Sequence, residues 1–238
     1  MYGGQPIAVV MPAFNEEALI GRAVAQVPEY VDRIFVVDDA STDRTAERVR
    51  SVRRHGLILQ SHGRNQGVGA AIRSGYRAAL AQGMEIVAVM AGDAQMDPRD
   101  LPALLEAVLG GAGYAKGNRF AWSGRETMPP ARYLGGALFS WLTRPASWCW
   151  HVFDSQCGYT AITRAALESI ALDELWPGFG YPNDLLAALA AAGVEIVDVP
   201  VRPVYNGEYS GIGARVVLGV MPGVLWRCQR WRKVNGGA

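Results

Sequence analysis

Residues 88–98 place acidic and amide side chains directly after a short hydrophobic run. The run ends at Met90, and Asp93, Gln95 and Asp97 follow it, with Pro98 just behind. Carboxylate and amide oxygens crowded at the end of a β-strand suit a hard divalent cation. In an α/β protein, such a cation usually holds phosphate oxygens of a ligand. The segment therefore predicts a nucleotide-handling enzyme.

Two further segments carry chemistry-bearing residues where hydrophobic runs stop. Pro12 and Ala13 end the first run of the chain, and Asp38 and Asp39 end the second. In a doubly wound sheet, ligands bind beyond the carboxyl ends of the strands, so these positions and Asp93 would meet at one crevice. For Asp38 and Asp39, helix capping and loop solvation are the alternative roles.

Residues 64–76, RNQGVGAAIRSGY, place Gly67 and Gly69 before a helical pattern. Backbone amides at such a helix start can cradle a phosphate group. The spacing does not complete GxGxxG, because position 72 is Ile72. A tight turn followed by close packing of an alanine-rich helix explains the same glycines.

These candidate residues need elements that position them, and the first hundred residues supply four strand–helix steps. Alternation of short apolar runs with helical periodicity is typical of a parallel sheet with crossover helices. Strands are predicted over 7–11, 33–39, 57–60 and 85–90, and helices after Asn15, over 43–54 with Ser41, Thr42 and Asp43 as N-cap candidates, over 67–82, and from Pro98 through Val108. The fold class is therefore α/β, with a mostly parallel central sheet and helices on both faces.

After residue 110 the pattern is less regular. Turn formers dominate 121–133, and 134–153 is strongly apolar, with four aromatic residues before Phe153 and an interruption at Pro145. A strand is predicted over 157–162, a helix over 182–193 closed by Gly193, and a strand over 194–201. The tail from Ala214 to Lys233 mixes apolar and cationic residues.

Composition excludes several classes of protein. The 238 residues are half hydrophobic and carry a formal charge of +1, so no nucleic acid partner is expected. Three cysteines without a CxxC pair fit a reducing cytoplasm better than a disulfide framework or a zinc site. The N-terminus lacks a signal-peptide pattern, and no run reaches the roughly 20 apolar residues of a membrane span. We expect a soluble protein or one that lies on a membrane surface.

Six motifs together resemble the family 2 glycosyltransferases, in the branch of dolichol-phosphate mannose synthase and bacterial polyprenyl-phosphate glycosyltransferases. The resemblance covers roughly residues 6–213. The motifs are PAFNEE (12–17), VVDDASTDRT (36–45), NQGVGAAIRSGY (65–76), GDAQMDP (92–98), GNR (117–119) and FDSQCGYTAI (153–162), in the family's order.

This resemblance implies a GT-A type nucleotide-binding sandwich. It divides the chain into a catalytic domain over 1–213, with a nucleotide-sugar half (1–120) and an acceptor half (121–213), followed by a basic amphipathic helix or tail over 214–238. Asp93 and Gln95 would coordinate Mg²⁺ or Mn²⁺ on the donor diphosphate, and Arg119 would meet the phosphates. The residues expected to bind the donor are Pro12, Ala13, Phe14, Glu16, Val37, Asp38, Asp39, Gly92 and Arg132.

The chemistry agrees with that assignment, because a departing nucleoside diphosphate gains negative charge that a cation and an arginine stabilise. Asp93 and Arg119 are therefore expected to be catalytic. The chain departs from the family at Ala91, where many relatives carry the first Asp of a DxD triplet. A metal ion can still bind through Asp93, Gln95, phosphates and water, since Mg²⁺ commonly keeps several waters.

A hydroxyl acceptor would require a general base, and Asp184 in YPNDLL is the candidate. Pro182 and Asn183 replace part of the usual acidic pattern there. Alternatively, Asp184 or Asn183 caps the helix that follows. A phosphate acceptor is already ionised and needs no base. Asp154 either orients the acceptor or caps a turn.

Two apolar segments bear on the acceptor. The stretch 134–153 and the tail 216–233 combine aromatic residues with arginines, which suits helices at an anionic membrane surface. Ordinary core helices are the alternative. Arg132, Arg144 and Arg202 are possible phosphate contacts. The glycine-rich segment 204–215, with Tyr205, Glu208 and Ser210, would be either a lid over the donor or a plain connector.

The resulting expectation is an inverting glycosyltransferase that moves a hexose from a GDP- or UDP-sugar to a polyprenyl phosphate at the cytoplasmic membrane face. A transferase with a soluble or protein hydroxyl acceptor is one alternative, and a degenerate nucleotide-sugar-binding module is another. A dinucleotide oxidoreductase is disfavoured, because the first strand–helix turn, PAFNEE, has no glycine fingerprint.

Overall fold

The computed structural model describes residues 1–122, 128, 130–204 and 214–235. For 130–132, 214–218, 220–221 and 232–235 the description is limited to the backbone. Within it, one seven-stranded sheet runs through the protein in the order β3-β2-β1-β4-β6-β5-β7. The strands are β1 (Ile7–Ala13), β2 (Arg33–Asp38), β3 (Leu57–Ser61), β4 (Ile86–Val89), β5 (Tyr114–Asn118), β6 (Thr160–Thr163) and β7 (Ile196–Pro200).

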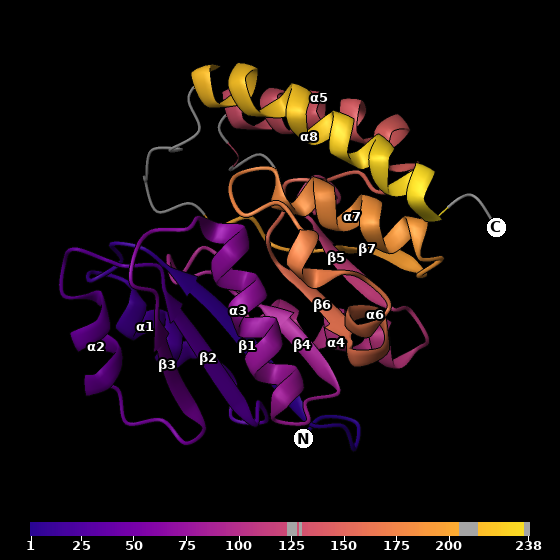
Figure 1. Cartoon of the computed structure of the whole chain (residues 1–238). Coiled ribbons are helices and arrows are strands. Elements are labelled where there is room, and N and C mark those ends of the chain that lie inside the picture. The colour runs from indigo at the N-terminus through magenta and orange to yellow at the C-terminus, as the bar shows by residue number, and fades with distance from the viewer. Residues whose placement is uncertain (123–127, 129, 205–213, 236–238) are drawn as a thin grey trace.

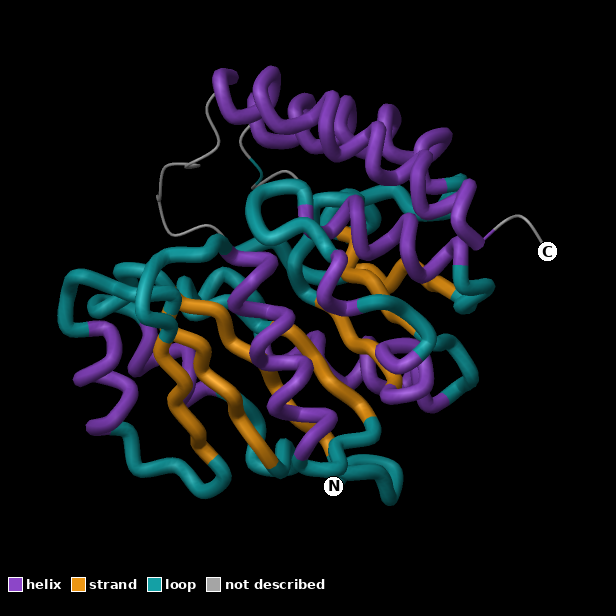
Figure 2. The backbone as a smooth tube through the Cα atoms, in the orientation of Figure 1, coloured by secondary structure: helices purple, strands orange, loops and turns teal. Residues whose placement is uncertain are grey.

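The sheet is mostly parallel, as the alternation of strands and helices predicts. Strands β1 to β4 pair in parallel, as do β5 and β7, and β6 runs antiparallel between β4 and β5. Because β6 is antiparallel to both of its neighbours, β4 and β5 run in the same direction. The carboxyl ends of β1, β2, β4 and β5 therefore share one edge of the sheet (Figures 1 and 2).

Helices cover both faces of this sheet. They are α1 (Ile20–Gln26), α2 (Thr45–Ser51), α3 (Val68–Ala81), α4 (Leu101–Leu109), α5 (Pro130–Ser147), α6 (Arg164–Glu168), α7 (Tyr181–Ala191) and α8 (Ala214–Asn235), with the 3-10 turns η1 (Pro98–Asp100) and η3 (Leu172–Glu174). Ala8 and Val10 of β1 join the apolar cluster of α3 and α7, whereas Val9 and Met11 join that of α1, α2 and α4. Burial on both faces explains the unbroken apolar run of β1.

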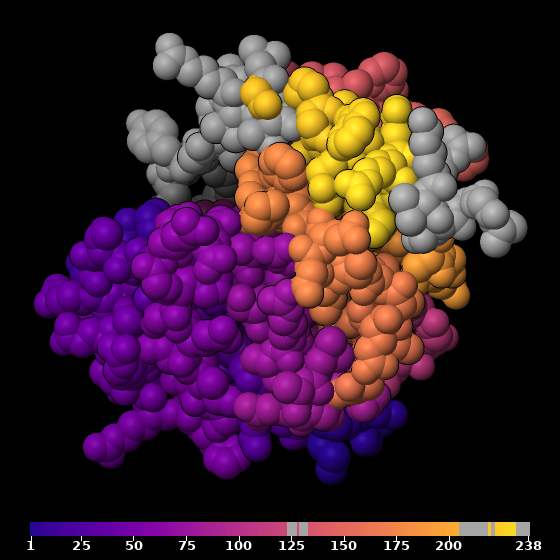
Figure 3. All heavy atoms as spheres, in the orientation of Figure 1, coloured from indigo at the N-terminus to yellow at the C-terminus, as the bar shows by residue number. Residues whose placement is uncertain are grey.

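A third layer lies outside α7. Helices α5 and α8 run side by side over it, far from strands β1 to β3 (Figure 1). In the space-filling view, the first hundred residues and the segments after residue 150 occupy opposite sides of the molecule (Figure 3). Within the residues that the structure describes, none of the helices combines the length and apolarity needed to cross a bilayer.

Several predicted boundaries are wrong. Helix α1 begins at Ile20 rather than near Asn15. Helix α2 covers Thr45–Ser51, and its N-cap is Arg44 and not one of the predicted residues, although the Asp43 carboxylate accepts the N–H of Thr45. Strand β6 begins at Thr160, not residue 157. Pro145 lies inside α5, which continues to Ser147, so a proline two residues from the helix end does not interrupt it.

Strand β5 is absent from the sequence prediction. Its sequence, YAKGN, contains a lysine and a glycine and has no β-branched residue, so propensity gives no signal. All five residues are nevertheless buried, because β6 and β7 pair on its two sides and helix α4 packs nearby. Tertiary pairing therefore decides this strand.

Candidate active site

Backbone hydrogen bonds bring the predicted donor segments together at the carboxyl edge. Ala13 lies opposite Asp38 in the strand register. The N–H of Asp39 donates to the Ala13 carbonyl at 2.9 Å, and the N–H of Gly92 donates to the Pro12 carbonyl at 3.2 Å. The segments after β1, β2 and β4 thus adjoin, as expected from a doubly wound sheet.

Asp38 and Asp39 are buried and organise the loops around them. Asp38 Oδ1 accepts the N–H of Ser41 at 3.0 Å. Asp39 accepts the N–H groups of Gln66 at 2.9 Å and Gly67 at 2.7 Å. Neither residue caps a helix or is solvated, which were the alternatives to donor binding, and the donor role stays a prediction. With the contact from His62 Nδ1 included, about one of the roughly four acceptor sites of the Asp39 carboxylate is left for a nucleoside.

His62 is a site residue that the sequence analysis missed. Its Nδ1 lies 2.6 Å from Asp39 Oδ1, and its Nε2 lies 2.9 Å from the Ser74 hydroxyl. The side chain is 7% exposed. Its position directly after β3, at the same carboxyl edge, was the available signal.

The remaining donor candidates line the loop after β1 or support it. Phe14 is 45% exposed, whereas Val37 is fully buried beneath the edge. The N–H of Glu16 donates to the Thr45 hydroxyl at 2.7 Å, and that of Asn15 donates to the Ser41 hydroxyl at 2.9 Å. These bonds hold the loop after β1 against the loop after β2. The structure therefore provides an exposed aromatic ring beside two fixed loops.

The predicted metal segment forms a tight turn. Asp93 Oδ1 accepts the N–H of Gln95 at 3.0 Å, and Ala94 between them has a φ of 54°. A left-handed non-glycine residue costs about 1 kcal/mol, and such strain is typical of functional sites. Both side chains are half-buried. The turn therefore holds two oxygen-bearing side chains at the carboxyl edge.

These two side chains fit a cation that retains other ligands. In the described part of the chain, no three His, Cys, Asp or Glu residues form a group suited to a metal ion. Asp93 and Gln95 would thus contribute one carboxylate and one amide oxygen, with donor phosphates and water completing the shell. Oxygen ligands and several waters suit Mg²⁺ and Mn²⁺.

Asp97 serves a different purpose from its neighbour Asp93. The Arg99 guanidinium bonds both of its oxygens, which lowers the pKa of Asp97. Arg202 contributes at 3.5 Å, and the Arg202 N–H also donates to Asp100 at 2.7 Å. Arg202, a predicted phosphate candidate, is therefore engaged in fixing this segment. The backbone bridge between Met96 and Pro203 joins the same two segments.

Arg119 is held by a fully buried carboxylate. Its Nε and Nη2 lie 2.7 and 2.9 Å from the Asp154 oxygens, and its N–H also donates to Asp154. The Arg119 side chain is 24% exposed. A bidentate pair of this kind fixes the guanidinium plane. Asp154 therefore positions the predicted phosphate contact instead of capping a turn.

A second cation supports the same carboxylate. Lys116 on β5 is fully buried, and its Nζ donates to the Cys157 carbonyl. Burial alone would raise the pKa of Asp154, but the charges of Arg119 and Lys116 hold it below its usual value. Burial lowers the pKa of Lys116 and raises that of Asp198, whose Oδ2 accepts from Asn118. This charge cluster lies under the carboxyl end of β5.

Asp184 lies in the first turn of α7 and is fully buried. Its oxygens accept from the N–H of Trp176 at 2.7 Å and from the Trp231 indole at 2.8 Å, and Arg227 pairs with it at 3.2 Å. The capping prediction is wrong, because Gly180 is the N-cap and no side chain caps the helix. The general-base role remains a prediction, but both carboxylate oxygens are already engaged.

Gly67 and Gly69 serve close packing in this arrangement. A Cβ on Gly67 would lie 2.6 Å from the Pro177 carbonyl oxygen, and one on Gly69 would overlap the Trp176 carbonyl oxygen. Gly67 also has a φ of 94°, which favours glycine. This supports the tight-turn interpretation. The side chain of Arg132 and the predicted lid residues Tyr205, Glu208 and Ser210 lie outside the described residues.

A mostly parallel sheet with acidic, amide and arginine side chains at one carboxyl edge defines the class of GT-A type glycosyltransferases. The solved structure of glucosyl-3-phosphoglycerate synthase from Mycobacterium tuberculosis, in complex with Mn²⁺, uridine diphosphate and glucosyl-3-phosphoglycerate, is similar to this fold. Its TM-score is 0.66 at 29% identity, over 94% of this chain and 80% of that one.

Sequence comparison identifies the family. The model of glycosyl transferase family 2 matches residues 8–171. An uncharacterized glycosyltransferase of Mycobacterium tuberculosis is 34% identical over 83% of this chain and 85% of its own length. The undecaprenyl-phosphate mannosyltransferase of Micrococcus luteus is 29% identical over 89% of this chain and 91% of its own length. The chain belongs to glycosyl transferase family 2 and is an enzyme that transfers a sugar, which confirms the resemblance and the GT-A fold expected from it.

Proposed function

We propose that this enzyme transfers a hexose, with inversion, from a GDP- or UDP-sugar to a polyprenyl phosphate at the cytoplasmic face of a membrane. The observation that carries the acceptor assignment is that helix α5 exposes large apolar side chains and buries polar ones. The donor assignment depends on the carboxyl edge of the sheet. Each half of the proposal therefore depends on a different part of the molecule.

The donor diphosphate would lie against the turn of Asp93 and Gln95, which supply oxygen ligands to Mg²⁺ or Mn²⁺. The bound cation would neutralise charge that develops on the departing nucleoside diphosphate. Arg119, fixed by Asp154, would supply a second positive charge to the same oxygens. The Mn²⁺ and uridine diphosphate in the similar solved structure support this assignment.

Helix α5 buries three hydroxyl side chains, beside Phe139 and Ala146, and exposes large apolar ones. Ser140, Thr143 and Ser147 are at most 4% exposed. Leu138 and Trp141, on the opposite side, are 57% and 66% exposed. A surface helix in water normally has the reverse arrangement. Such a helix favours contact with an apolar phase over contact with water.

The apolar surface extends beyond α5. Trp148, Trp150 and Phe153 follow the helix at 53%, 61% and 50% exposed, and Trp226 of α8 is 63% exposed. Exposed tryptophans are typical of the membrane–water interface, where the ring is partly buried and its N–H stays hydrated. A polyprenyl chain lies in that phase, with its phosphate at the surface. The charged phosphate needs no general base, which agrees with the paired state of Asp184.

A partition assay tests the proposal. Radiolabelled GDP- and UDP-sugars would be incubated with Mn²⁺, polyprenyl phosphate and the full chain, and organic-phase label counted. We expect label from one donor, abolished by omitting the lipid or by Asp93→Asn. Absence of organic-phase label with every donor, alongside transfer to a water-soluble acceptor, would overturn the lipid acceptor.

A soluble acceptor is the second candidate, because the similar solved structure holds glucosyl-3-phosphoglycerate. In that case Asp184→Asn should abolish transfer and leave donor binding intact. Transfer to the hydroxyl acceptor at an unchanged rate in this variant would remove the general base from consideration.

A further inference from the structure

Helix α8 is joined to α7 by one buried carboxylate. Asp184 Oδ1 accepts from the Trp231 indole at 2.8 Å, and the Arg227 guanidinium lies 3.3 and 3.2 Å from its two oxygens. Asp184 is fully buried, and the Arg227 side chain is 19% exposed. Hydrogen bonds with an ionised acceptor are stronger than neutral ones, so this joint fixes the helix closely.

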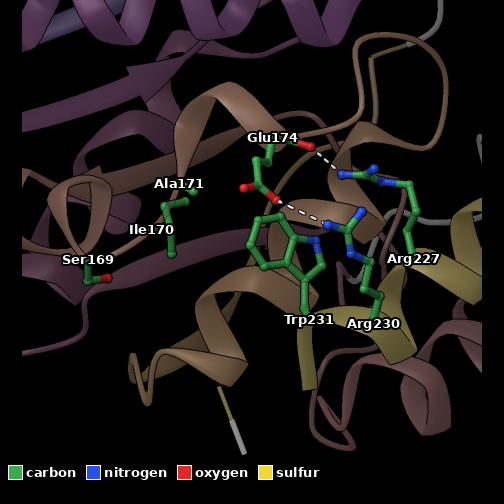
Figure 4. Close-up of a pocket in the computed structure, with 7 residues that line it drawn as sticks. All are labelled: Ser169, Ile170, Ala171, Glu174, Arg227, Arg230 and Trp231. Atoms are coloured by element: carbon green, nitrogen blue, oxygen red, sulfur yellow. Dashed lines mark hydrogen bonds and ion pairs between the residues drawn. The ribbon is translucent and has the colours of Figure 1, made fainter. Parts of the chain in front are cut away.

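The same carboxylate also holds the segment before α7. The N–H of Trp176 donates to Asp184 Oδ2 at 2.7 Å. Arg227 Nη2 donates to the Glu174 carbonyl, and its guanidinium lies 5.9 Å from the Trp176 ring centre. Arg227 and Arg230 both extend from α8 toward Glu174, beside the Trp231 ring (Figure 4). Together with Ser169–Ala171, these side chains line a pocket of about 200 Å³.

The segment Glu174–Pro177 in turn holds the loop before α3. The N–H of Ala70 donates to the Pro177 carbonyl at 2.9 Å. Gly67, just before α3, and Gly69, in its first turn, allow the carbonyl oxygens of Trp176 and Pro177 to approach where a Cβ would collide. Arg73 Nη1 also donates to the Leu175 carbonyl at 3.0 Å.

This loop ends at the donor edge. The N–H groups of Gln66 and Gly67 donate to Asp39, the carboxylate at the end of β2. The contacts from α8 to the donor edge are therefore continuous, and each is a hydrogen bond or a close backbone approach. Among the described residues, the Asp184 carboxylate bonds both to α8, through Arg227 and Trp231, and to the segment that holds the loop, through the N–H of Trp176.

We infer that Asp184 is a positioning residue that ties helix α8, through Glu174–Pro177, to residues 62–70 at the donor site, which form the loop before α3 and the start of that helix. Its role is then to keep this loop in the conformation that binds the nucleotide, and not to remove a proton from an acceptor. The inference rests on the proposed function only for the nucleotide-sugar donor, and it holds for a lipid or a soluble acceptor alike.

The test compares Asp184→Asn and Arg227→Gln with Arg230→Gln in the full chain. Arg230 is a matched control, since it extends from the same helix toward Glu174 but is 53% exposed and pairs at 3.9 Å. Hydrogen exchange at the amides of Gly67 and Ala70 reports on the loop without any ligand. Calorimetry with UDP and with GDP, each with Mn²⁺, reports on the donor site.

We expect Asp184→Asn and Arg227→Gln to speed exchange at both amides and to weaken nucleotide binding by about two- to thirtyfold, with Arg230→Gln at the wild-type value. The double variant should be little worse than either single one, because both remove the same joint. If Asp184→Asn does not fold, Arg227→Gln and the milder Trp231→Phe are compared with Arg230→Gln in the same two measurements.

Wild-type exchange at Gly67 and Ala70 in the folded variants would overturn the inference. So would lost turnover in Asp184→Asn alone, with nucleotide binding intact and Arg227→Gln fully active, since that result identifies a general base. If the wild-type protein binds neither nucleotide, the proposed donor is wrong, while the exchange measurement still decides the role of Asp184.

Discussion

The two sides of the molecule place their polar residues in opposite ways. Around strands β1 to β4, apolar side chains fill both faces of the sheet and polar ones gather at its carboxyl edge. In the layer of α5, α7 and α8, apolar residues such as Val224 and Trp231 are buried as well, but polar residues such as Asn183 are buried among them. The large apolar residues Leu138 and Trp141 of α5 face outward. The first arrangement suits a polar ligand at an edge, and the second suits an apolar surface above the protein.

A network of buried polar side chains links the helices of the outer layer. Asn183 accepts from Gln156 at 2.7 Å and donates to the hydroxyls of Thr143 and Ser155. Cys228 of α8 donates to the Asn183 carbonyl at 3.4 Å. Buried polar groups without partners cost free energy, so this network fixes how the helices pack. The layer is thus held together from inside while its apolar surface stays available.

The largest expected effect is in the donor half. Asp93→Asn should lower the transfer rate by about a thousandfold, because one charged ligand of the cation at the leaving diphosphate is lost. Initial rates at saturating donor measure it. Glu47→Gln on α2 removes an equal charge from an exposed position and serves as the control. A rate in Asp93→Asn within a few-fold of wild type would contradict the donor site at this edge.

The charge cluster of Lys116, Arg119 and Asp154, at the end of β5, should have the largest effect on the free energy of unfolding. Asp154→Asn leaves Arg119 and the buried Lys116 without their carboxylate, and we expect about 3 kcal/mol of destabilisation in urea unfolding. Glu17→Gln breaks an exposed pair with Arg44 and should have little effect on the free energy of unfolding. Equal losses of stability in the two variants would show that the buried cluster stabilises the fold no more than an exposed ion pair does.

The deficit of Asp154→Asn should depend on pH. The folded-state pKa of Asp154 lies below its usual value of about 3.9, so the carboxylate stabilises the fold at higher pH, and that contribution is lost as pH falls through the folded pKa. The stability difference between wild type and variant is therefore largest near neutral pH and narrows below about pH 4. A constant difference would contradict the lowered pKa.

In the outer layer, Leu138→Gln and Trp141→Gln should each weaken binding to anionic vesicles by about tenfold, since each removes exposed apolar area from the contact. Co-sedimentation with the vesicles measures this binding. Leu109→Gln is the control, because Leu109 is also exposed, at 39%, but ends α4. Nucleotide binding should be unchanged in all three. Equal vesicle binding by the α5 variants and the control would contradict the proposed contact between α5 and a membrane.

The smallest effect sharpens the donor site. Ala91→Asp restores the acidic residue that many family members carry two positions before Asp93, and it adds one charged oxygen ligand. We expect the Mn²⁺ concentration for half-maximal activity to fall about threefold to tenfold. No change would indicate that the backbone at Ala91, whose N–H donates to the Met96 sulfur, keeps the new side chain away from the cation.

The sequence by itself determined strands β1 to β4 and the edge of the sheet at which they end. Unbroken apolar runs such as 7–11 predict buried parallel strands, and a parallel sheet necessarily brings its carboxyl ends to one edge. The meeting of Pro12, Asp39 and Gly92 follows from that geometry alone. Family motifs added the sugar-transfer activity, which the comparisons confirm.

Only the tertiary structure decided the partners of individual side chains. Lys116 makes β5 look polar, yet its side chain is buried and donates to the Cys157 carbonyl. From the sequence, Asp184 is interpreted as a helix cap or a general base. In the structure, its oxygens accept hydrogen bonds from Arg227 and Trp231, which are more than forty positions away in the chain. Local patterns report which face of an element is apolar. They do not report which distant groups meet a buried charge, because long-range packing sets those contacts.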